Sequence, residues 1–302
     1  MRMFFLMHSC LAAAVLILAS GCESKFEKYY RENGPAVEAK LETIESLAGL
    51  VKAEPTVPPD YDAWVRAVEG IGRIQSIADS KELDPAVKEQ ATANVDSLRK
   101  ESEAMFDKIK LSPPSEIRFQ GVDNPNAAVL ILNANGTAER DADFVKRNEG
   151  SGSWYLNSTS IQDLESAQKQ FEFVKSLRFV LILRQVDIVE PEFIGNDDQE
   201  HAEYQMGAIE CEAFLFSIDD RQLIGRFRFA ATNERSALSV GPFELFMPDE
   251  PDAAVSVFRS RLFDSARRYA AAIAAELSPQ IQAQNRIVRD FLGTRLKPIE
   301  SN

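Results

Sequence analysis

Histidine is scarce in this chain, because 302 residues contain only His8 and His201, which lie far apart in the sequence. This scarcity excludes sites with several histidine ligands, which are common in zinc hydrolases. His8 lies in a leader segment described below, so a Ser-His-Asp triad would have His201 as its one available base. The G-x-S-x-G turn that presents such a serine is absent, and so are Walker-type and G-x-G-x-x-G phosphate loops. We therefore expect neither a metal site nor a cofactor.

Basic residues are also few: 34 Lys and Arg stand against 47 Asp and Glu, which gives a formal net charge of −13. No basic cluster offsets this excess along the chain, and an acidic surface repels nucleic-acid phosphates. Nucleic acid is therefore not an expected partner. The hydrophobic content of 45% and charged content of 27% are those of an ordinary globular protein.

A hydrophobic run long enough to span a bilayer is missing too. The longest run, from Phe4 to Leu18, is shorter than the ~20 residues that a transmembrane helix needs. It follows the basic Arg2 and ends in the small residues of 19–21. A basic start, a short apolar core and a small-residue exit are typical of a secretory signal peptide.

The exit from this run, Ala19-Ser20-Gly21-Cys22, resembles the lipobox of bacterial lipoproteins. The resemblance covers only the first 22 residues, and Ala19 stands where that family usually has leucine. It implies cleavage before Cys22, attachment of diacylglycerol to its thiol, and acylation with a fatty acid such as palmitate. Glu23, rather than aspartate, follows the cysteine, which in this family favours the periplasmic face of the outer membrane if the bacterium is Gram-negative. We expect a lipid-anchored protein of the cell envelope.

Cysteine is equally sparse, with three residues in all. Cys10 leaves with the signal peptide and Cys22 carries the lipid, so Cys211 is the one thiol that remains. No intramolecular disulfide is then possible. Cys211 lies in the apolar alternation AIECEAFLF, which predicts a small buried hydrophobic residue rather than a reactive thiol.

The first part of the mature chain, residues 22–110, has helical periodicity. Apolar residues recur at three- and four-residue spacing in three stretches, which begin at Pro35, after Asp60 and at Pro85. The proline-rich stretch EPTVPPDYD separates the first two. Trp64 lies on the apolar stripe of the second and is expected in the core. Three amphipathic helices on short links predict an antiparallel bundle, or a helical stalk.

Strand patterns begin after the paired prolines at 113–114. Residues 127–134 and 177–189 are apolar runs, and the second is expected to be an inner strand. Residues 207–218 and 223–231 predict a long hairpin, in which Glu210 and Glu212 face Arg226 and Arg228.

Helical spacing returns from Asp252 to Leu277, and Ser278-Pro279 begins a further expected helix. The fold class is therefore α+β: an N-terminal antiparallel helical segment, then an antiparallel or mixed sheet covered by C-terminal helices. The predicted organisation is a signal peptide at 1–21, a helical region at 22–110 and an α+β domain at 111–302. This order of elements is loosely similar to that of several envelope lipoproteins that bind larger membrane machines.

Two loops are candidate contacts for a partner or ligand. The stretch at 192–205 concentrates polar side chains, namely Asp197, Asp198, Glu200 and His201, but its spacing matches no EF-hand calcium loop. The stretch at 149–155 ends in Trp154 and Tyr155 after a Gly/Ser-rich segment, and these rings suit a contact with a ligand or a partner. Loops carry binding function more often than the strands that support them.

These observations predict a non-enzymatic lipoprotein, anchored through Cys22, that docks on a protein of the envelope. A lipoprotein that binds a small molecule or a glycan in a cleft is the alternative. A hydrolase that uses two carboxylates stays open, because the 47 acidic residues offer many pairs and the sequence selects none of them.

Overall fold

The computed structural model describes residues 25–80, 83–112, 116–119, 123–132, 145–147, 154–156, 164–196, 202–233 and 251–278. The expected signal peptide, Cys22 and the helix expected after Pro279 lie outside these residues.

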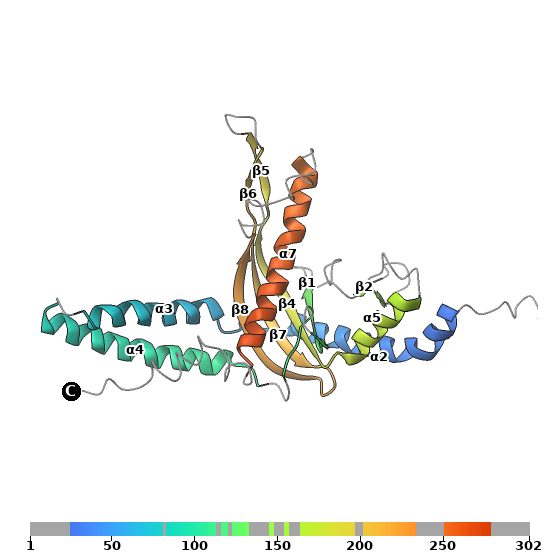
Figure 1. Ribbon diagram of the computed structural model, residues 1–302, viewed down its shortest axis with the longest axis horizontal. Helices are drawn as coiled ribbons and strands as arrows, with labels where there is room; N and C mark the ends of the chain where they lie inside the picture. Colours follow the sequence, from blue (N-terminus) through green and yellow to red (C-terminus); the bar gives the residue numbers. More distant parts are fainter. Residues whose placement is uncertain are drawn as a thin grey trace, which may run out of the picture.

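A mixed four-stranded sheet forms the centre of the molecule (Figure 1). Its strands follow the order β1 (Ala127–Leu132), β4 (Phe179–Val189), β7 (Ala208–Ser217) and β8 (Gln222–Thr232). The pair β1–β4 is parallel, whereas β4–β7 and β7–β8 are antiparallel. The predicted inner strand and the predicted hairpin are both confirmed.

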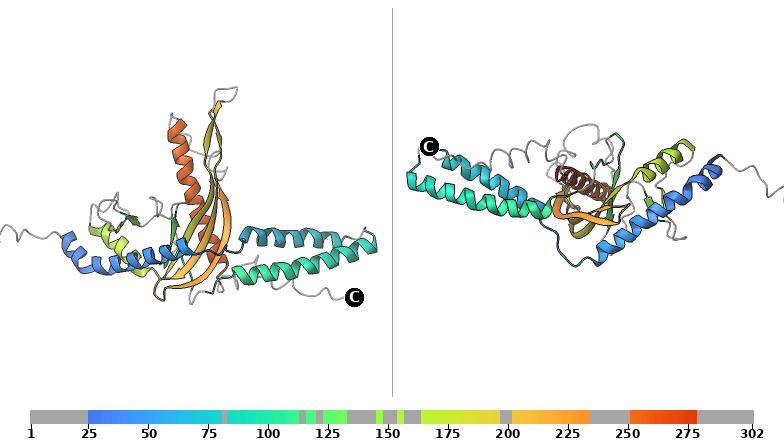
Figure 2. Two further views of the ribbon diagram at one scale, coloured as in Figure 1. Left: turned by 180° about the vertical axis from the view of Figure 1, so that it is seen from behind. Right: turned by 90° about the horizontal axis from the view of Figure 1, so that it is seen from below.

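Helices cover both faces of the sheet, as the two opposite views show (Figures 1 and 2). On one face lies α7 (Pro251–Glu276). The first turn of α3 (Tyr61–Ala78) and the last turn of α4 (Pro85–Ile109) pack on the same face. On the other lie α2 (Lys25–Ala53) and α5 (Leu164–Ser176). The α+β fold class is therefore confirmed, and it is a helix–sheet–helix sandwich.

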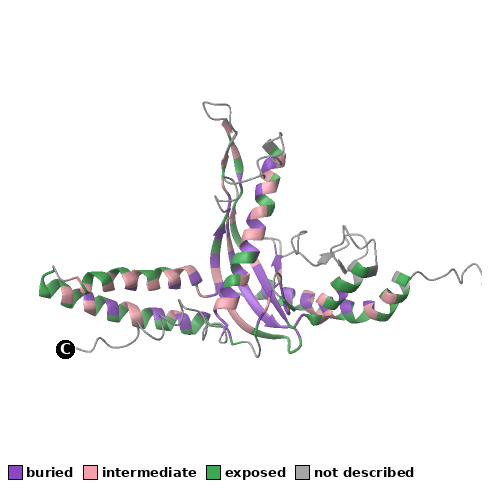
Figure 3. Cartoon of the chain, in the orientation of Figure 1, coloured by how far each residue is buried: buried purple, intermediate pink, exposed green. Residues whose placement is uncertain are grey.

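The alternation of side chains along the strands explains these two layers. Phe179, Leu181 and Leu183 of β4 belong to the core beneath α7, whereas Val180 and Ile182 belong to the core beneath α2 and α5. Apolar residues on both faces let β4 bury both sides, as an inner strand must. Figure 3 shows this buried centre, with exposed residues along the outer sides of the helices.

The three N-terminal helices, all of which lie in the described residues, do not form one bundle. Helix α3 pairs with α4, while α2 packs on α5 and β4. The reason is the linker at 54–60, which we call the linker below. Its prolines exclude a tight helical turn, and it leads the chain along the sheet to β8, where Pro59 O accepts a hydrogen bond from Arg228 N (2.8 Å).

Helix α2 begins at Lys25, ten residues before the start expected at Pro35. Proline inside a helix removes one hydrogen bond and costs about 3 kcal/mol. Contacts of the preceding turns offset this cost, since the rings of Tyr29 and Tyr30 lie 5.6 and 5.7 Å from that of Phe171 in α5. Asn33 Nδ2 also donates to Tyr29 O at 3.0 Å.

Two smaller hairpins complete the fold. One pairs β2 (Val145–Arg147) with β3 (Trp154–Leu156), and the other pairs β5 (Glu192–Asn196) with β6 (Ala202–Gln205). The second hairpin extends the β4–β7 pair beyond the sheet, alongside the first turns of α7 (Figure 1). Tyr204 fixes it there, with its ring 4.9 Å from that of Phe258 in α7.

A close approach between β8 and Leu111, two residues after the end of α4, gives a stability prediction. A methyl group added at Gly225 would overlap Cδ2 of Leu111, whose side chain is fully buried. The backbone N–H of Leu111 donates to Leu277 O at 3.2 Å, which holds this residue in place. We expect Gly225→Ala to lower the free energy of unfolding by about 1–3 kcal/mol, the usual range for overpacking. Urea unfolding measures this. Gly49→Ala is the control, because an added methyl group there meets nothing within 4 Å. If the overlap is the cause, Gly225→Ala should cost much less in the Leu111→Ala background, measured against Leu111→Ala alone, than in the wild-type chain; an unchanged cost contradicts it.

Candidate functional site

Helices α3 and α4 form a two-helix arm, and we call them the arm from here on. They pack on each other along their length and project from the sheet, on the side opposite to the first turns of α2 (Figures 1 and 2). The apolar seam between them includes Ile71, Ala91 and Val95, all buried. Asp60 and Asp84 cap the two helix starts, accepting from Ala63 N and Ala86 N at 3.0 and 2.8 Å.

The end of the arm that is farthest from the sheet carries apolar side chains on its surface. Ile77, Leu83 and Val87 are 45%, 37% and 45% exposed. Single exposed apolar residues are ordinary, but three within eleven positions at one end of an element are a candidate contact surface. We call these three residues the arm tip.

An aromatic cluster holds the other end of the arm against the sheet. It brings together side chains of α3, α4, β8 and α7, namely Tyr61, Trp64, Phe106, Phe227, Phe229 and Tyr269. Successive ring centroids lie 5.3–6.5 Å apart, within the range of favourable aromatic contacts. We call these six residues the arm root.

Polar contacts add direction to this apolar packing. Tyr61 Oη donates to Glu276 Oε2 at 2.8 Å, and Tyr269 Oη donates to Asp62 Oδ1 at 3.3 Å. The other carboxylate oxygen of Asp62 accepts from Ala230 N at 2.8 Å. Burial, and then the nearby carboxylates, raise the pKa of Tyr61 and raise that of Tyr269 to about 12. Both phenols are therefore neutral donors at physiological pH.

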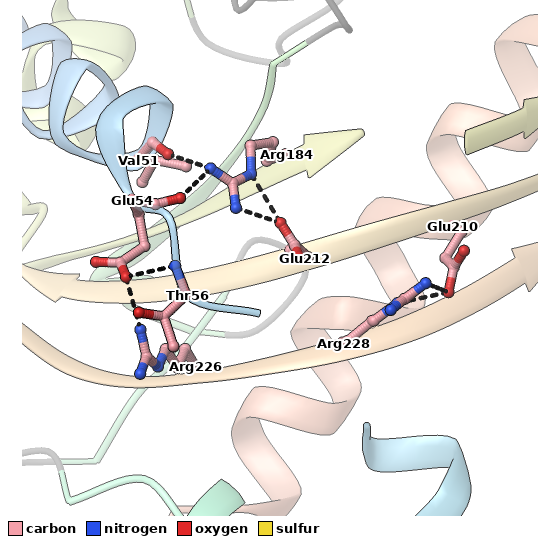
Figure 4. A network of polar contacts seen from close by, with 8 residues as sticks. All are labelled: Val51, Glu54, Thr56, Arg184, Glu210, Glu212, Arg226 and Arg228. Atoms are coloured by element: carbon pink, nitrogen blue, oxygen red, sulfur yellow. Dashed lines mark hydrogen bonds and ion pairs between the residues drawn. The ribbon is translucent and has the colours of Figure 1, made fainter. Parts of the chain in front are cut away.

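A network of ion pairs lies on the opposite face of the sheet, where the linker crosses it (Figure 4). Arg184 of β4 is its centre, because its Nε donates to Glu212 Oε2 of β7 at 2.7 Å. Its NH1 donates to Val51 O and Glu54 O, at 2.7 and 2.8 Å. These are carbonyls at the end of α2, where a cation also complements the helix dipole. Arg184 thus joins the sheet to α2.

The same network fixes the linker itself. Arg226 NH1 of β8 donates to Glu54 Oε1 at 3.1 Å, and Thr56 N donates to the same oxygen at 3.1 Å. Hydrogen bonds from Thr56, with a smaller contribution from Arg226, hold the pKa of the Glu54 carboxyl below its ordinary value. The linker therefore stays attached to the sheet at its first residues as well as at Pro59.

The pairing expected across the β7–β8 hairpin is only half confirmed. Arg228 Nε donates to Glu210 Oε1 at 2.5 Å, as expected. Glu212 instead pairs with Arg184, on the other side of β7, and Arg226 pairs with Glu54. The sequence alone gives no register between β4 and β7, which is what brings Arg184 and Glu212 opposite each other.

The residues expected to contact a partner or ligand fall mainly outside the described part. Trp154 and Tyr155 lie in β3, where they pair with Arg147 and Lys146 of β2, but their side chains are not among those described. Asp197, Asp198, Glu200 and His201 lie outside the described residues, as does Cys22. Their proposed contacts therefore stay predictions. The arm tip and the arm root are elements that the sequence did not single out.

Cys211 is buried in the sheet beneath α7, as expected, with 0% of its surface exposed. Burial, with smaller contributions from Glu210 and Glu212, raises the pKa of its thiol to about 12. The thiolate is the reactive form, so almost none of the native Cys211 side chain is in its nucleophilic state at pH 8.

This predicts a simple chemical test. The test uses the mature chain with Cys22→Ser and an aromatic disulfide reagent at pH 8. We expect Cys211 to stay unmodified in buffer and to react at once in about 6 M guanidinium, which fully denatures ordinary domains. Absorbance of the released thiolate measures both rates. Rapid modification of the folded chain contradicts the burial of this side chain.

Within the described ranges, His, Cys, Asp and Glu side chains form no group of three or more that could hold a metal ion. None of the described helices combines the length and the apolar character that a membrane span requires.

No family model matches the chain, and no curated protein matches it. Among solved structures, the chain is distantly similar to a protein from Xanthomonas campestris that is assigned to the family model DUF330. The identity is 12%, the match covers 58% of this chain and 98% of that chain, and the TM-score is 0.23.

Proposed function

We propose that this protein is a lipid-anchored lipoprotein of the bacterial envelope that docks on another envelope protein through its arm. The observation that carries the proposal is the arm itself, a two-helix projection whose root is packed into the core and whose tip exposes Ile77, Leu83 and Val87. A projection with a fixed root and an apolar end suits contact with a macromolecule.

The position of the expected anchor supports this assignment. Cys22 precedes the first residue of α2 by three positions, so the lipid would lie next to the start of that helix. The arm leaves the sheet on the opposite side (Figure 1). A tether at Cys22 would therefore leave the arm tip free to reach a partner.

The anchor is tested by Cys22→Ala. We expect the wild-type chain to fractionate with membranes and to incorporate labelled fatty acid, and the variant to do neither. Two or more acyl chains hold a protein on a bilayer almost permanently, whereas none of the described helices is long and apolar enough to span one. Cys211→Ala is the matched control and should remain in the membrane fraction. Incorporation of labelled fatty acid by Cys22→Ala at the wild-type level would exclude Cys22 as the lipid anchor.

Docking is tested by photo-cross-linking in intact cells. A cross-linking amino acid at Ile77, Leu83 or Val87 is expected to capture one discrete protein, and this product should disappear in the Cys22→Ala background. Leu50, an exposed apolar residue of α2 (55% exposed), is the matched control position. Capture from Leu50 alone, or no capture from the arm tip, would contradict docking through the arm.

A further inference from the structure

Charge is divided along α2 in a way that the packing of this helix does not require. In residues 25–31 three exposed cations, Lys25, Lys28 and Arg31, stand with one carboxylate, Glu27. Residues 32–45 reverse the balance, with Lys40 as the one cation and the four carboxylates Glu32, Glu38, Glu42 and Glu45. We call Lys25, Lys28 and Arg31 the basic patch.

The basic patch is not explained by the stability of the helix. The dipole of a helix disfavours cations in its first turn and fades beyond it, so the helix gains no stability from Lys25 or Lys28 through its dipole. Three exposed cations within two turns favour an anionic partner.

The patch also lies within electrostatic reach of a bilayer at the expected anchor. Two residues separate Cys22 from Lys25, so the Cα atoms of these two residues lie at most about 10 Å apart. Arg31 lies about 9 Å further along the helix, at a rise of 1.5 Å per residue. Screening at physiological salt acts over about 8 Å, so Lys25 and Lys28 lie nearest to the surface charge of the bilayer and Arg31 lies towards the limit of its reach. Glu38 and Glu45 lie about 20 and 30 Å beyond Lys25, where that charge is screened.

We propose that the basic patch binds the phosphate headgroups of anionic phospholipids and holds the first two turns of α2 on the membrane surface. This inference deepens the proposed function and rests on it, because the lipid at Cys22 brings the patch to the bilayer.

The experiment replaces the biological anchor with a chemical one. The chain from Cys22 onward is coupled through that thiol to a maleimide lipid in vesicles, and Cys211 does not compete because it is fully buried. One vesicle preparation contains phosphatidylcholine alone and the other contains phosphatidylglycerol as well. Acetylation of lysines is then followed by mass spectrometry.

We expect Lys25 and Lys28 to be acetylated about threefold or more slowly on the phosphatidylglycerol vesicles than on the phosphatidylcholine vesicles. The reason is that the attraction between each lysine and the anionic surface is appreciable. Lys100 and Lys108, exposed on the arm, are controls within the same molecule and should react at equal rates on both. Equal rates for all four lysines on both vesicles would overturn the proposal. So would slower reaction at the arm lysines to the same degree.

A charge-reversed chain provides a second measurement. With the same coupling, we expect the amides of residues 25–34 in the unaltered chain to exchange more slowly on phosphatidylglycerol vesicles than on phosphatidylcholine vesicles. The triple variant Lys25→Glu, Lys28→Glu and Arg31→Glu should abolish this difference. The matched triple variant Lys52→Glu, Lys100→Glu and Lys108→Glu carries the same change in net charge and should retain it. Loss in both variants would overturn the patch as the cause. Because the tether is chemical, these results do not depend on whether cells acylate Cys22, which the fractionation experiment measures separately.

Discussion

Glu212→Ala is expected to lower the free energy of unfolding by about 2–3 kcal/mol. The side chain of Glu212 is 7% exposed and that of Arg184 is 23% exposed, so this pair is largely withdrawn from water. Removing one partner leaves the guanidinium with its two carbonyl acceptors and no counter-charge. The remaining exposure of Arg184 to solvent places the expected value below the 3–5 kcal/mol typical of fully buried pairs. Urea unfolding monitored by circular dichroism measures it.

A matched control lies two residues away on the same strand. Glu210 also pairs with an arginine, Arg228, but the two side chains are 36% and 32% exposed. Glu210→Ala should therefore cost less than about 1 kcal/mol. Equal losses for the two alanine variants would contradict burial as the source of the difference. The double variant Arg184→Met and Glu212→Leu should recover part of the loss, because it removes both charges together.

Trp64→Ala is expected to have an effect at least as large, about 3–5 kcal/mol, the usual loss for a buried aromatic residue. Trp64 is 2% exposed, and its ring lies 5.6 Å from Tyr61 and 5.3 Å from Phe106. The cavity would open at the arm root, between the two helices of the arm and the sheet. Unfolding in urea gives the total loss.

Hydrogen exchange shows where the loss falls. In Trp64→Ala we expect the amides of α3 and α4 to exchange faster by a larger factor than those of β4, since local opening of the arm becomes cheaper than global unfolding. Val87→Ala, at an exposed position of the arm, should change neither measurement by more than about 0.5 kcal/mol. An equal increase in the amide exchange rates of the arm and of the sheet would show that the arm does not open independently of the sheet.

Patterns that depend on one element could be predicted from the sequence. The apolar run at 177–189 identified an inner strand, and the helical spacing after Asp60 and from Pro85 identified two helix starts. Trp64 and Cys211 were assigned to the core from their periodicity alone. In each case the sequence pattern reflects which face of one element is buried.

What the sequence could not reveal depends on pairing between distant elements. The stripe of α3 fits α2 or α4 equally well, and only the path of the linker along the sheet decides that α4 is its partner. Arg184 could have faced any carboxylate, because its partner Glu212 is set by the register of β4 on β7. The sequence indicated a helix start at Pro35, whereas the helix includes the turns before it. Those turns contact Phe171 through Tyr29 and Tyr30, and Phe171 lies more than 130 residues further along the chain, so the sequence pattern does not reveal the contact.

The arm root also sets how accurately the arm tip can be positioned. Helix α4 has 25 residues and is therefore about 37 Å long, so a tilt of about 10° at its base would move the far end by about 6 Å. The arm is thus a lever with its pivot in the aromatic core. Loosening the pivot would spread the far end over a wider volume and weaken the proposed docking there, although the altered residue would lie a full helix length away from the arm tip.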